Sequence, residues 1–180
     1  AFYFVTEGKY KNRIIIPFKK PNGSLFYFQA RALFNDYPKY LNPESTQVKA
    51  SMVLYPFKES EPVLVCEGPL DAISLQLAGV NATATIGSSP SQTQLETIKD
   101  MGCDIVVAYD NDSAGKIGTD KIEKMRKDLM MPQIQVCTPP AIHKDWNDAF
   151  KEGFDLKSYV RDATKDYDLG YLINTNIESW

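Results

Sequence analysis

The sequence predicts an α/β protein in which a parallel four-stranded sheet, covered by helices on both faces, follows a smaller strand-rich basic unit. After Pro62, short apolar runs alternate with helical patterns, and this order is typical of parallel βαβ units with right-handed crossovers. Before that residue, two apolar runs flank a turn, which favours antiparallel strands. We therefore expect the basic unit over 1–61, the α/β domain over 62–165, and a tail or linker over 166–180.

The basic unit is predicted to contain a β-hairpin. The runs RIIIPF and LFYFQARA have the apolar and alternating patterns of strands, and Asn22-Gly23 between them favours a tight turn. The following segment, NDYPKYLNPEST, contains two prolines and many polar residues. We expect it to be an ordered loop without helix or strand.

The α/β domain is predicted to have four strands that alternate with helices. The strands are PVLVC, ATATI, DIVVAY and QIQVCT. The helices are PLDAISLQLAG, which ends at Gly79, SSPSQTQLETIKDMG, which has Pro90 near its first turn, and AGKIGTDKIEKMRKDLM. In sheets of this kind, ligands bind where the carboxyl ends of the strands meet the loops.

Composition restricts the class of protein. A chain of 180 residues that is 43% hydrophobic can bury a core, and no apolar run approaches the ~20 residues of a membrane helix. The chain begins at Ala1 without a leader pattern, so we expect a cytoplasmic protein cut from a longer chain. Three widely spaced cysteines favour reduced thiols. The single histidine, His143, has no cysteine at zinc-site spacing and is expected to be a loop residue.

Charge is unevenly distributed along the chain, whose net charge is -3. Residues 1–61 contain nine basic and five acidic residues, a net charge of +4, whereas 62–180 contain eleven and eighteen, a net charge of -7. This asymmetry favours a surface for a polyanion beside a metal site. An unevenly charged solvated surface is the alternative interpretation.

Acidic residues follow three of the four predicted strands. Glu67 follows VLVC, Asp110 and Asp112 follow IVVAY, and Asp145 with Asp148 lies in KDWND after QIQVCT. If the strands are parallel, these carboxylates meet at one edge of the sheet, where a divalent cation would relieve their repulsion. Ligands that are all oxygen favour Mg²⁺ or Mn²⁺ over Zn²⁺. Any single aspartate here is more simply a helix cap, but capping does not explain the whole set.

Two other charged residues have both a structural and a functional interpretation. Asp71 in PLDAI is suited to the first turn of a helix, where the helix dipole favours a carboxylate. Lys116 in SAGK suggests a phosphate-binding loop, but GxxxxGK[ST] requires glycine where Asp110 stands and Ser or Thr where Ile117 stands. Lys116 is therefore either a phosphate contact or a surface lysine.

Three of these segments resemble the motifs of the TOPRIM domain. VLVCEGPLDAISLQLAG is similar to its EGxxD segment, VVAYDNDSAGK to its DxD motif with the following AG[RK], and KDWND to its last acidic motif. The preceding stretch, from YKNRIIIPF to PKYLNPEST, resembles the basic subdomain of bacterial DnaG-type and phage primases. The resemblance runs from about Tyr10 to Phe150, and the short front unit is closer in size to the primase domains of phage primase-helicases.

The resemblance implies the catalytic core of a DNA primase, which makes short RNA primers from ribonucleoside triphosphates on a single-stranded DNA template. It implies Mg²⁺ or Mn²⁺ as cofactor, and it implies a replicative helicase and a zinc-binding module, both absent from this chain, as partners. The implied catalytic and metal-ligating residues are Glu67, Asp110 and Asp112. The residues implied to line a template and nucleotide groove are Arg13, Arg31, Lys39 and Asn42. The implied lesser members of the site are Asp71, Lys144 and Asp145.

Three alternatives remain open at this point. TOPRIM domains also occur in nucleases, which would use the same carboxylates to hydrolyse phosphodiesters. A non-catalytic nucleic-acid-binding module, in which the acids are only structural, is another. Within the primase interpretation, Glu67 is either a metal ligand or a general base, because crowding by other carboxylates raises a carboxyl pKa.

Overall fold

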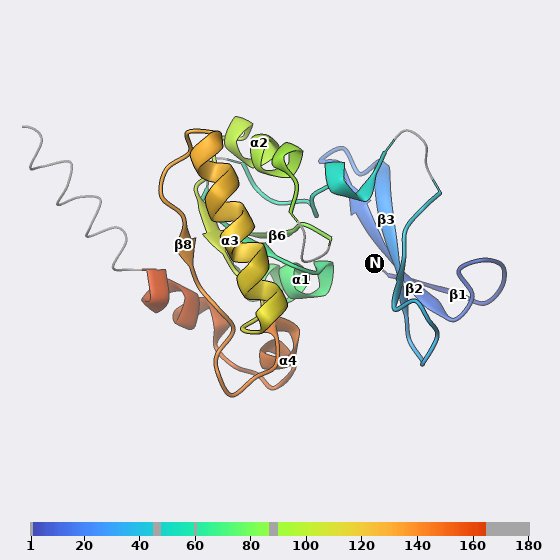
Figure 1. Cartoon of the computed structure of the whole chain (residues 1–180). Coiled ribbons are helices and arrows are strands. Elements are labelled where there is room, and N and C mark those ends of the chain that lie inside the picture. Colours follow the sequence, from blue (N-terminus) through green and yellow to red (C-terminus); the bar gives the residue numbers. More distant parts are fainter. Residues whose placement is uncertain (1, 45–47, 60, 87–89, 165–180) are drawn as a thin grey trace, which may run out of the picture.

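The computed structural model describes residues 2–44, 48–59, 61–86 and 90–164, and it contains two four-stranded sheets (Figure 1). The first sheet is antiparallel, with the order β1 (Tyr3–Val5), β2 (Arg13–Lys19), β3 (Leu25–Ala32) and β4 (Tyr40–Leu41). The second is parallel, with the order β6 (Ala82–Ala84), β5 (Val63–Cys66), β7 (Ile105–Val107) and β8 (Gln135–Val136). The predicted fold class is therefore confirmed.

The antiparallel sheet is built around the β2–β3 hairpin that the sequence predicts. Gly23 has a φ of +82° in the turn, and the Asn22 side-chain oxygen accepts hydrogen bonds from the Ser24 amide at 3.0 Å and hydroxyl at 2.7 Å. The prediction of a loop without strand is wrong at Tyr40–Leu41, because β4 pairs with the edge of β3. Residues 45 and 46 of that predicted loop lie outside the described residues.

Helices cover both faces of the parallel sheet. On β5, Leu64 and Cys66 face α1 (Pro69–Leu77) and α4 (Trp146–Lys151), while Val63 and Val65 face α2 (Gln92–Asp100) and α3 (Ser113–Asp128). This alternation places every residue of β5 in a core, as expected for a strand in the middle of a parallel sheet. A further helix begins at Leu156. No helix among the described residues is both long and apolar enough to span a bilayer.

The two sheets are joined by a shared apolar cluster. Phe18 and Tyr27 of the antiparallel sheet pack with Val53, which follows the short 3₁₀ helix η1 (Ala50–Met52), and with Leu70 and Ile73 of α1. In addition, the Gln94 side-chain amide of α2 donates to the Val53 carbonyl at 2.6 Å. These contacts hold the basic sheet beside the ends of the parallel strands that carry the acidic residues.

The turn from β7 to α3 is shaped by a glycine. The Gly115 amide donates to the side chain of Asp112, the N-cap of α3, at 2.8 Å. A Cβ atom at Gly115 would lie 2.0 Å from the backbone carbonyl oxygen of Asp110, far inside van der Waals contact. Because the obstacle is backbone, a side chain at this position would displace Asp110 itself.

Replacing Gly115 with alanine is therefore expected to lower the free energy of unfolding by about 3 kcal/mol, the upper part of the range for overpacking a close contact. The measurement is urea unfolding of the Gly115→Ala variant followed by circular dichroism. Ser113→Ala, at an exposed position in the same turn, is the control and should unfold like the wild type. Equal stability of Gly115→Ala and the control would contradict the close approach.

Candidate active site

A cavity of about 370 Å³ lies between the antiparallel sheet and the carboxyl ends of the parallel strands. The antiparallel sheet contributes polar and basic side chains to its lining: Gln29, Arg31, Lys39, Tyr40 and Asn42. The parallel sheet and its loops contribute mainly acidic ones: Glu67, Asp71, Asp110, Lys144, Asp145 and Asn147. A larger cavity of about 690 Å³ elsewhere between the sheets is mainly apolar and contains none of the predicted site residues. The chemistry is thus concentrated in the smaller cavity.

Two of the predicted carboxylates lie at this edge, beyond the carboxyl ends of β5 and β7. Glu67 comes immediately after β5, and its Oε1 atom is buried without a hydrogen-bond partner among the described residues. Burial raises the pKa of Glu67, and the nearby charges of Asp110 and Asp112 raise it further. Burial also raises the pKa of Asp110, which follows β7. A buried carboxylate oxygen without a proton donor is a suitable ligand for a cation.

The electrostatics of Asp110 connect the acidic and basic sides of the cavity. After burial, the charges of Asp145 and Asp112 are the next causes of its raised pKa. Lys144 and Lys39 act in the opposite direction and lower it. The two lysines therefore supply part of the positive charge that the acidic edge needs.

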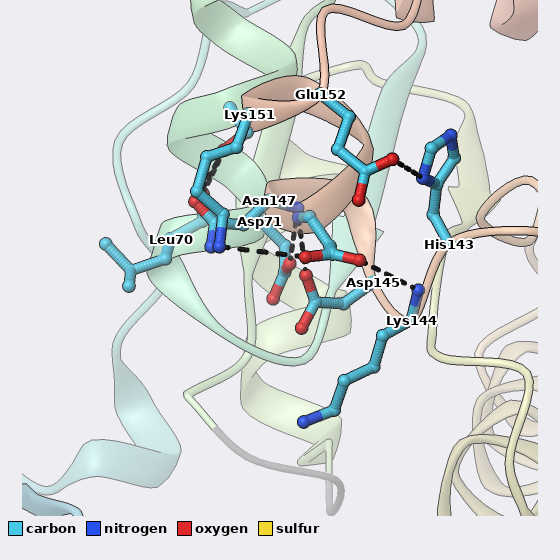
Figure 2. Close-up of polar contacts among 10 residues, drawn as sticks. Leu70, Asp71, His143, Lys144, Asp145, Asn147, Lys151 and Glu152 are labelled. Atoms are coloured by element: carbon cyan, nitrogen blue, oxygen red, sulfur yellow. Dashed lines mark hydrogen bonds and ion pairs between the residues drawn. The ribbon is translucent and has the colours of Figure 1, made fainter.

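Asp71 is the most strongly perturbed of these carboxyl groups. It lies in the first turn of α1, and burial, followed by the charges of Asp145 and Asp110, raises its pKa to about 7. A hydrogen bond from the backbone amide of Asn147 to Asp71 Oδ1, at 3.2 Å, lowers the pKa in part. Figure 2 shows Asp71 and Asp145 with their carboxylates close together. The first-turn position is as the sequence suggests, but the side chain belongs to the cavity.

The other two aspartates are helix N-caps. Asp112 Oδ1 accepts the Gly115 amide at the start of α3, and Asp145 Oδ1 accepts the Asp148 amide at 2.7 Å at the start of α4. The capping interpretation therefore applies to both residues. Asp145 also lines the cavity, whereas Asp112 is exposed and is not among the lining residues.

The acidic edge fits Mg²⁺ or Mn²⁺ in its chemistry, because all its donors are oxygen and Glu67 Oε1 is buried without a proton donor within the described part of the chain. Three of the predicted ligands, Glu67, Asp110 and Asp145, line this cavity, but they are not the group of three donor atoms that lies closest together. Across the described ranges, that group consists of His143, Asp148 and Glu152. The metal-ligating roles of Glu67, Asp110, Asp112 and Asp145 therefore stay predictions.

The basic side of the cavity is ordered by aromatic and amide contacts. The Arg31 guanidinium donates to the Tyr40 hydroxyl and lies 5.1 Å from the centre of the Tyr40 ring. Lys39 Nζ lies 5.9 Å from the same ring centre, and the Gln29 side-chain amide donates to Asn42 Oδ1 at 3.2 Å. Arg31, Lys39 and Asn42 thus line the same cavity as the carboxylates, and their role in a template and nucleotide groove stays a prediction.

Three predicted residues lie away from the cavity. Arg13 is 4% exposed, and its Nη1 atom lies 3.5 Å from the Ala30 carbonyl oxygen and 3.4 Å from that of Lys39, so it ties the backbone of the antiparallel sheet together. Lys116 is exposed on α3. Asp148 forms an ion pair with Lys151 at 3.7 Å. The structure does not bring these side chains to the predicted groove.

Sequence reasoning missed three polar residues that line the cavity, namely Gln29, Tyr40 and Asn147. Gln29 lies in a strand pattern whose alternation indicates only which face is buried, and Tyr40 lies in the segment that the sequence predicts to be a loop. Asn147 lies within KDWND but is uncharged, so the search for charged residues did not select it. Its backbone amide donates a hydrogen bond to Asp71 Oδ1. Only the three-dimensional arrangement identifies them.

The comparison with protein families agrees with this arrangement. Residues 64–150, which include the parallel sheet and α1 to α4 except for Val63 and Lys151 at the two ends, match the Toprim-like family. They therefore form a Toprim-like domain. The chain is 33% identical over 175 residues to the DNA primase of Listeria monocytogenes, a match that covers 87% of this chain and 28% of the relative. The chain thus spans less than a third of that relative's length.

Solved structures extend the similarity to the antiparallel sheet. A DNA primase domain from Pseudomonas aeruginosa has a TM-score of 0.75 at 21% identity, with 91% of this chain and 55% of that one covered. A DnaG primase catalytic domain bound to single-stranded DNA has a TM-score of 0.71 at 22% identity, with 91% and 57% covered. The chain thus has a Toprim-like domain over 64–150, its sequence is similar to that of a bacterial DNA primase, and its fold similarity includes both sheets.

The raised pKa of Asp71 predicts how stability depends on pH when divalent metal is removed. Between the ordinary carboxyl pKa near 4 and the folded-state pKa of about 7, the folded chain holds a proton that the unfolded chain releases. The free energy of unfolding should therefore fall as the pH rises through this window. Asp71→Asn should remove this part of the fall and be more stable than wild type at pH 8, by on the order of 3 kcal/mol.

This prediction is checked by urea unfolding in EDTA at pH 5 and pH 8. Asp100→Asn, at an exposed carboxylate in the last turn of α2, is the matched control and should keep the wild-type pH dependence. If Asp71→Asn also keeps it, the proton on Asp71 is not the source of the effect.

Proposed function

We propose that this chain is the catalytic core of a DNA primase, which joins ribonucleoside triphosphates into a short RNA primer on single-stranded DNA. The main support is the cavity itself, in which basic side chains from the antiparallel sheet face carboxylates at the edge of the parallel sheet. The DNA template and the ribonucleoside triphosphates are both polyanions. The basic side chains on one side of the cavity can bind their phosphates, and the carboxylates on the other side can hold a metal at the reacting phosphates. The similarity to bacterial primases supports this reaction over the nuclease and the binding module.

The acidic residues hold and position the metal. Glu67 and Asp110 at the strand ends are the proposed main ligands, with Asp112 and Asp145 beside them. Held by these residues, Mg²⁺ or Mn²⁺ would supply positive charge at the reacting phosphates and would favour ionisation of the 3′ hydroxyl. The alternative role for Glu67 is that of general base, because its raised pKa suits it to accept the hydroxyl proton.

The basic residues bind phosphate groups. Arg31 and Lys39 come from the antiparallel sheet and Lys144 from the loop before α4, so they approach the cavity from two sides. The contact of Arg31 with Tyr40 fixes the direction of the guanidinium, while Asn42 offers an amide for a base or sugar. We assign them to the template backbone and the nucleotide triphosphate.

We propose that the two sheets have different roles in the reaction. Residues 1–61 bind template and nucleotide, and residues 62–165 carry the metal-dependent chemistry. The predicted tail or linker, 166–180, lies outside the described residues. A zinc-binding module that recognises the template sequence and a replicative helicase are the proposed partners. We propose that the reaction takes place at the replication fork, in the cytoplasm of a bacterial or phage-infected cell.

The test of the function is primer synthesis by the purified chain with single-stranded template, ribonucleotides and Mg²⁺ or Mn²⁺. Asp110→Asn should reduce synthesis at least about 100-fold, the size of effect expected when a group that stabilises the transition state is lost. Asp120→Asn, at an exposed aspartate on α3, is the matched control and should stay active. Labelled RNA products are resolved on a denaturing gel.

Each competing function gives a different result in this assay. Shortening of the DNA without ribonucleotides indicates a nuclease, whereas template binding that is unaffected by metal, with neither product, indicates a binding module. A zinc-binding module from a related primase is supplied in trans in a parallel reaction. Failure to make RNA in its presence would exclude primer synthesis by this chain.

The basic wall predicts a salt dependence of template binding. Lys39→Ala should weaken binding to single-stranded DNA and make the slope of log affinity against log salt shallower by about 0.7, the value for one lost contact to a single strand. Fluorescence anisotropy with a labelled oligonucleotide from 50 to about 200 mM salt measures the slope. Lys124→Ala, exposed on α3, should leave it unchanged. An unchanged slope for Lys39→Ala would place the template elsewhere.

A further inference from the structure

A second group of ligand atoms lies beside the cavity, around the short helix α4. His143 precedes the helix, Asp148 is in it, and Glu152 is its C-cap. One donor atom from each lies within 4.8 Å of the other two. We propose that His143, Asp148 and Glu152 form a separate site for a divalent transition metal, of which Zn²⁺ is the most suitable.

The histidine is the observation that points to a ligand. Its side chain is only 5% exposed, and within the described part of the chain neither buried ring nitrogen has a hydrogen-bond partner. Buried polar side-chain atoms nearly always have such a partner, and an imidazole without one is unfavourable. Nδ1 faces Glu152 Oε2 at 3.4 Å (Figure 2). A metal ion between these two atoms would satisfy the nitrogen.

The ring is held in place to receive the ion. It packs edge to face against Phe154, with ring centres 5.3 Å apart and an interplanar angle of 72°, and the His143 backbone amide donates to the Pro140 carbonyl at 2.8 Å. Ligands about 2.1 Å from a tetrahedral zinc ion lie roughly 3.4 Å from each other. The separation of His143 Nδ1 and Glu152 Oε2 has this value, and the Glu152 side chain is 64% exposed and can adjust.

The ligand types decide which metal is preferred. One imidazole with two carboxylates suits zinc and its transition-metal neighbours, whereas Mg²⁺ prefers sites made of oxygen alone. The acidic edge of the cavity is such an oxygen site, so the two sites should take different metals. Lys151, whose Nζ lies 3.7 Å from Asp148 Oδ1, is the one basic side chain paired with this carboxylate among the described ion pairs, and the metal must displace it.

The position of the site gives it a structural role. Asp148 Oδ2 lies 3.4 Å from the Lys144 amide, and the Asp148 amide donates to Asp145 Oδ1. A metal bound by Asp148 would therefore fix the loop that carries Lys144 and Asp145 into the cavity. Binding by His143 and Glu152 would join both ends of α4 and stabilise the fold by mass action.

The experiment is a zinc titration of the full chain in millimolar Mg²⁺, which occupies the oxygen-only edge, with bound zinc measured by equilibrium dialysis. Wild type should bind one zinc ion and unfold at a higher temperature with it. Glu152→Gln and His143→Gln should each weaken binding at least about tenfold and lose the shift in unfolding temperature. Glu61→Gln, an exposed glutamate elsewhere, is the control and should bind zinc like the wild type.

Two results would overturn the proposal. Zinc affinity that is unchanged in Glu152→Gln excludes this ligand set, and because Glu152 is exposed, this variant should fold even if His143→Gln does not. Zinc affinity lost in Asp110→Asn but kept in Glu152→Gln would place the ion at the acidic edge instead. The visible absorption of Co²⁺ as a zinc substitute should agree, appearing in wild type and not in Glu152→Gln. These readouts do not depend on primer synthesis.

Discussion

The gathering of like charges at one edge of a parallel sheet is the constraint on which the rest of the molecule depends. Because β5 and β7 are parallel neighbours, Glu67 and Asp110 must leave the sheet at the same edge, where Asp71 and Asp145 join them. Burial and mutual repulsion raise the pKa of Glu67, Asp71 and Asp110, which means that the edge opposes folding when the carboxylates are ionised. The apolar clusters on both faces of the sheet must supply the compensating stability.

The antiparallel sheet makes the acidic edge chemically useful. Lys39 is close enough to lower the pKa of Asp110, as is Lys144 from the other side. This proximity depends on the cluster of Phe18, Val53 and Leu70, which holds the sheet against α1. The two sheets therefore form a single site, and contacts in this cluster, which reaches the cavity at Leu70, should influence how substrate phosphates meet the carboxylates.

Much of this arrangement could be predicted from the sequence, because period and strand order are local signals. The hairpin, the four parallel strands and the position of Glu67 and Asp110 at one edge all follow from them. The pairing of Tyr40–Leu41 could not be predicted, since a two-residue strand depends on the free edge of β3. The burial of Arg13 could not be predicted for a similar reason: its partners are backbone carbonyl oxygens, which the residue types in the sequence do not identify. The grouping of His143 with Asp148 and Glu152 could not be predicted either, because no cysteine stands at zinc-site spacing from His143. The two acidic side chains come close to the histidine only because of the conformation and length of α4.

Capping and metal binding are compatible roles for the same aspartate. A carboxylate has two oxygens, and at Asp112 and Asp145 one of them accepts a backbone amide at the start of a helix. A carboxylate at the start of a helix also interacts favourably with the helix dipole. The cap also restricts the side chain to one direction. Asp145, a cap that lines the cavity, therefore needs no rearrangement of its helix to face a cation there.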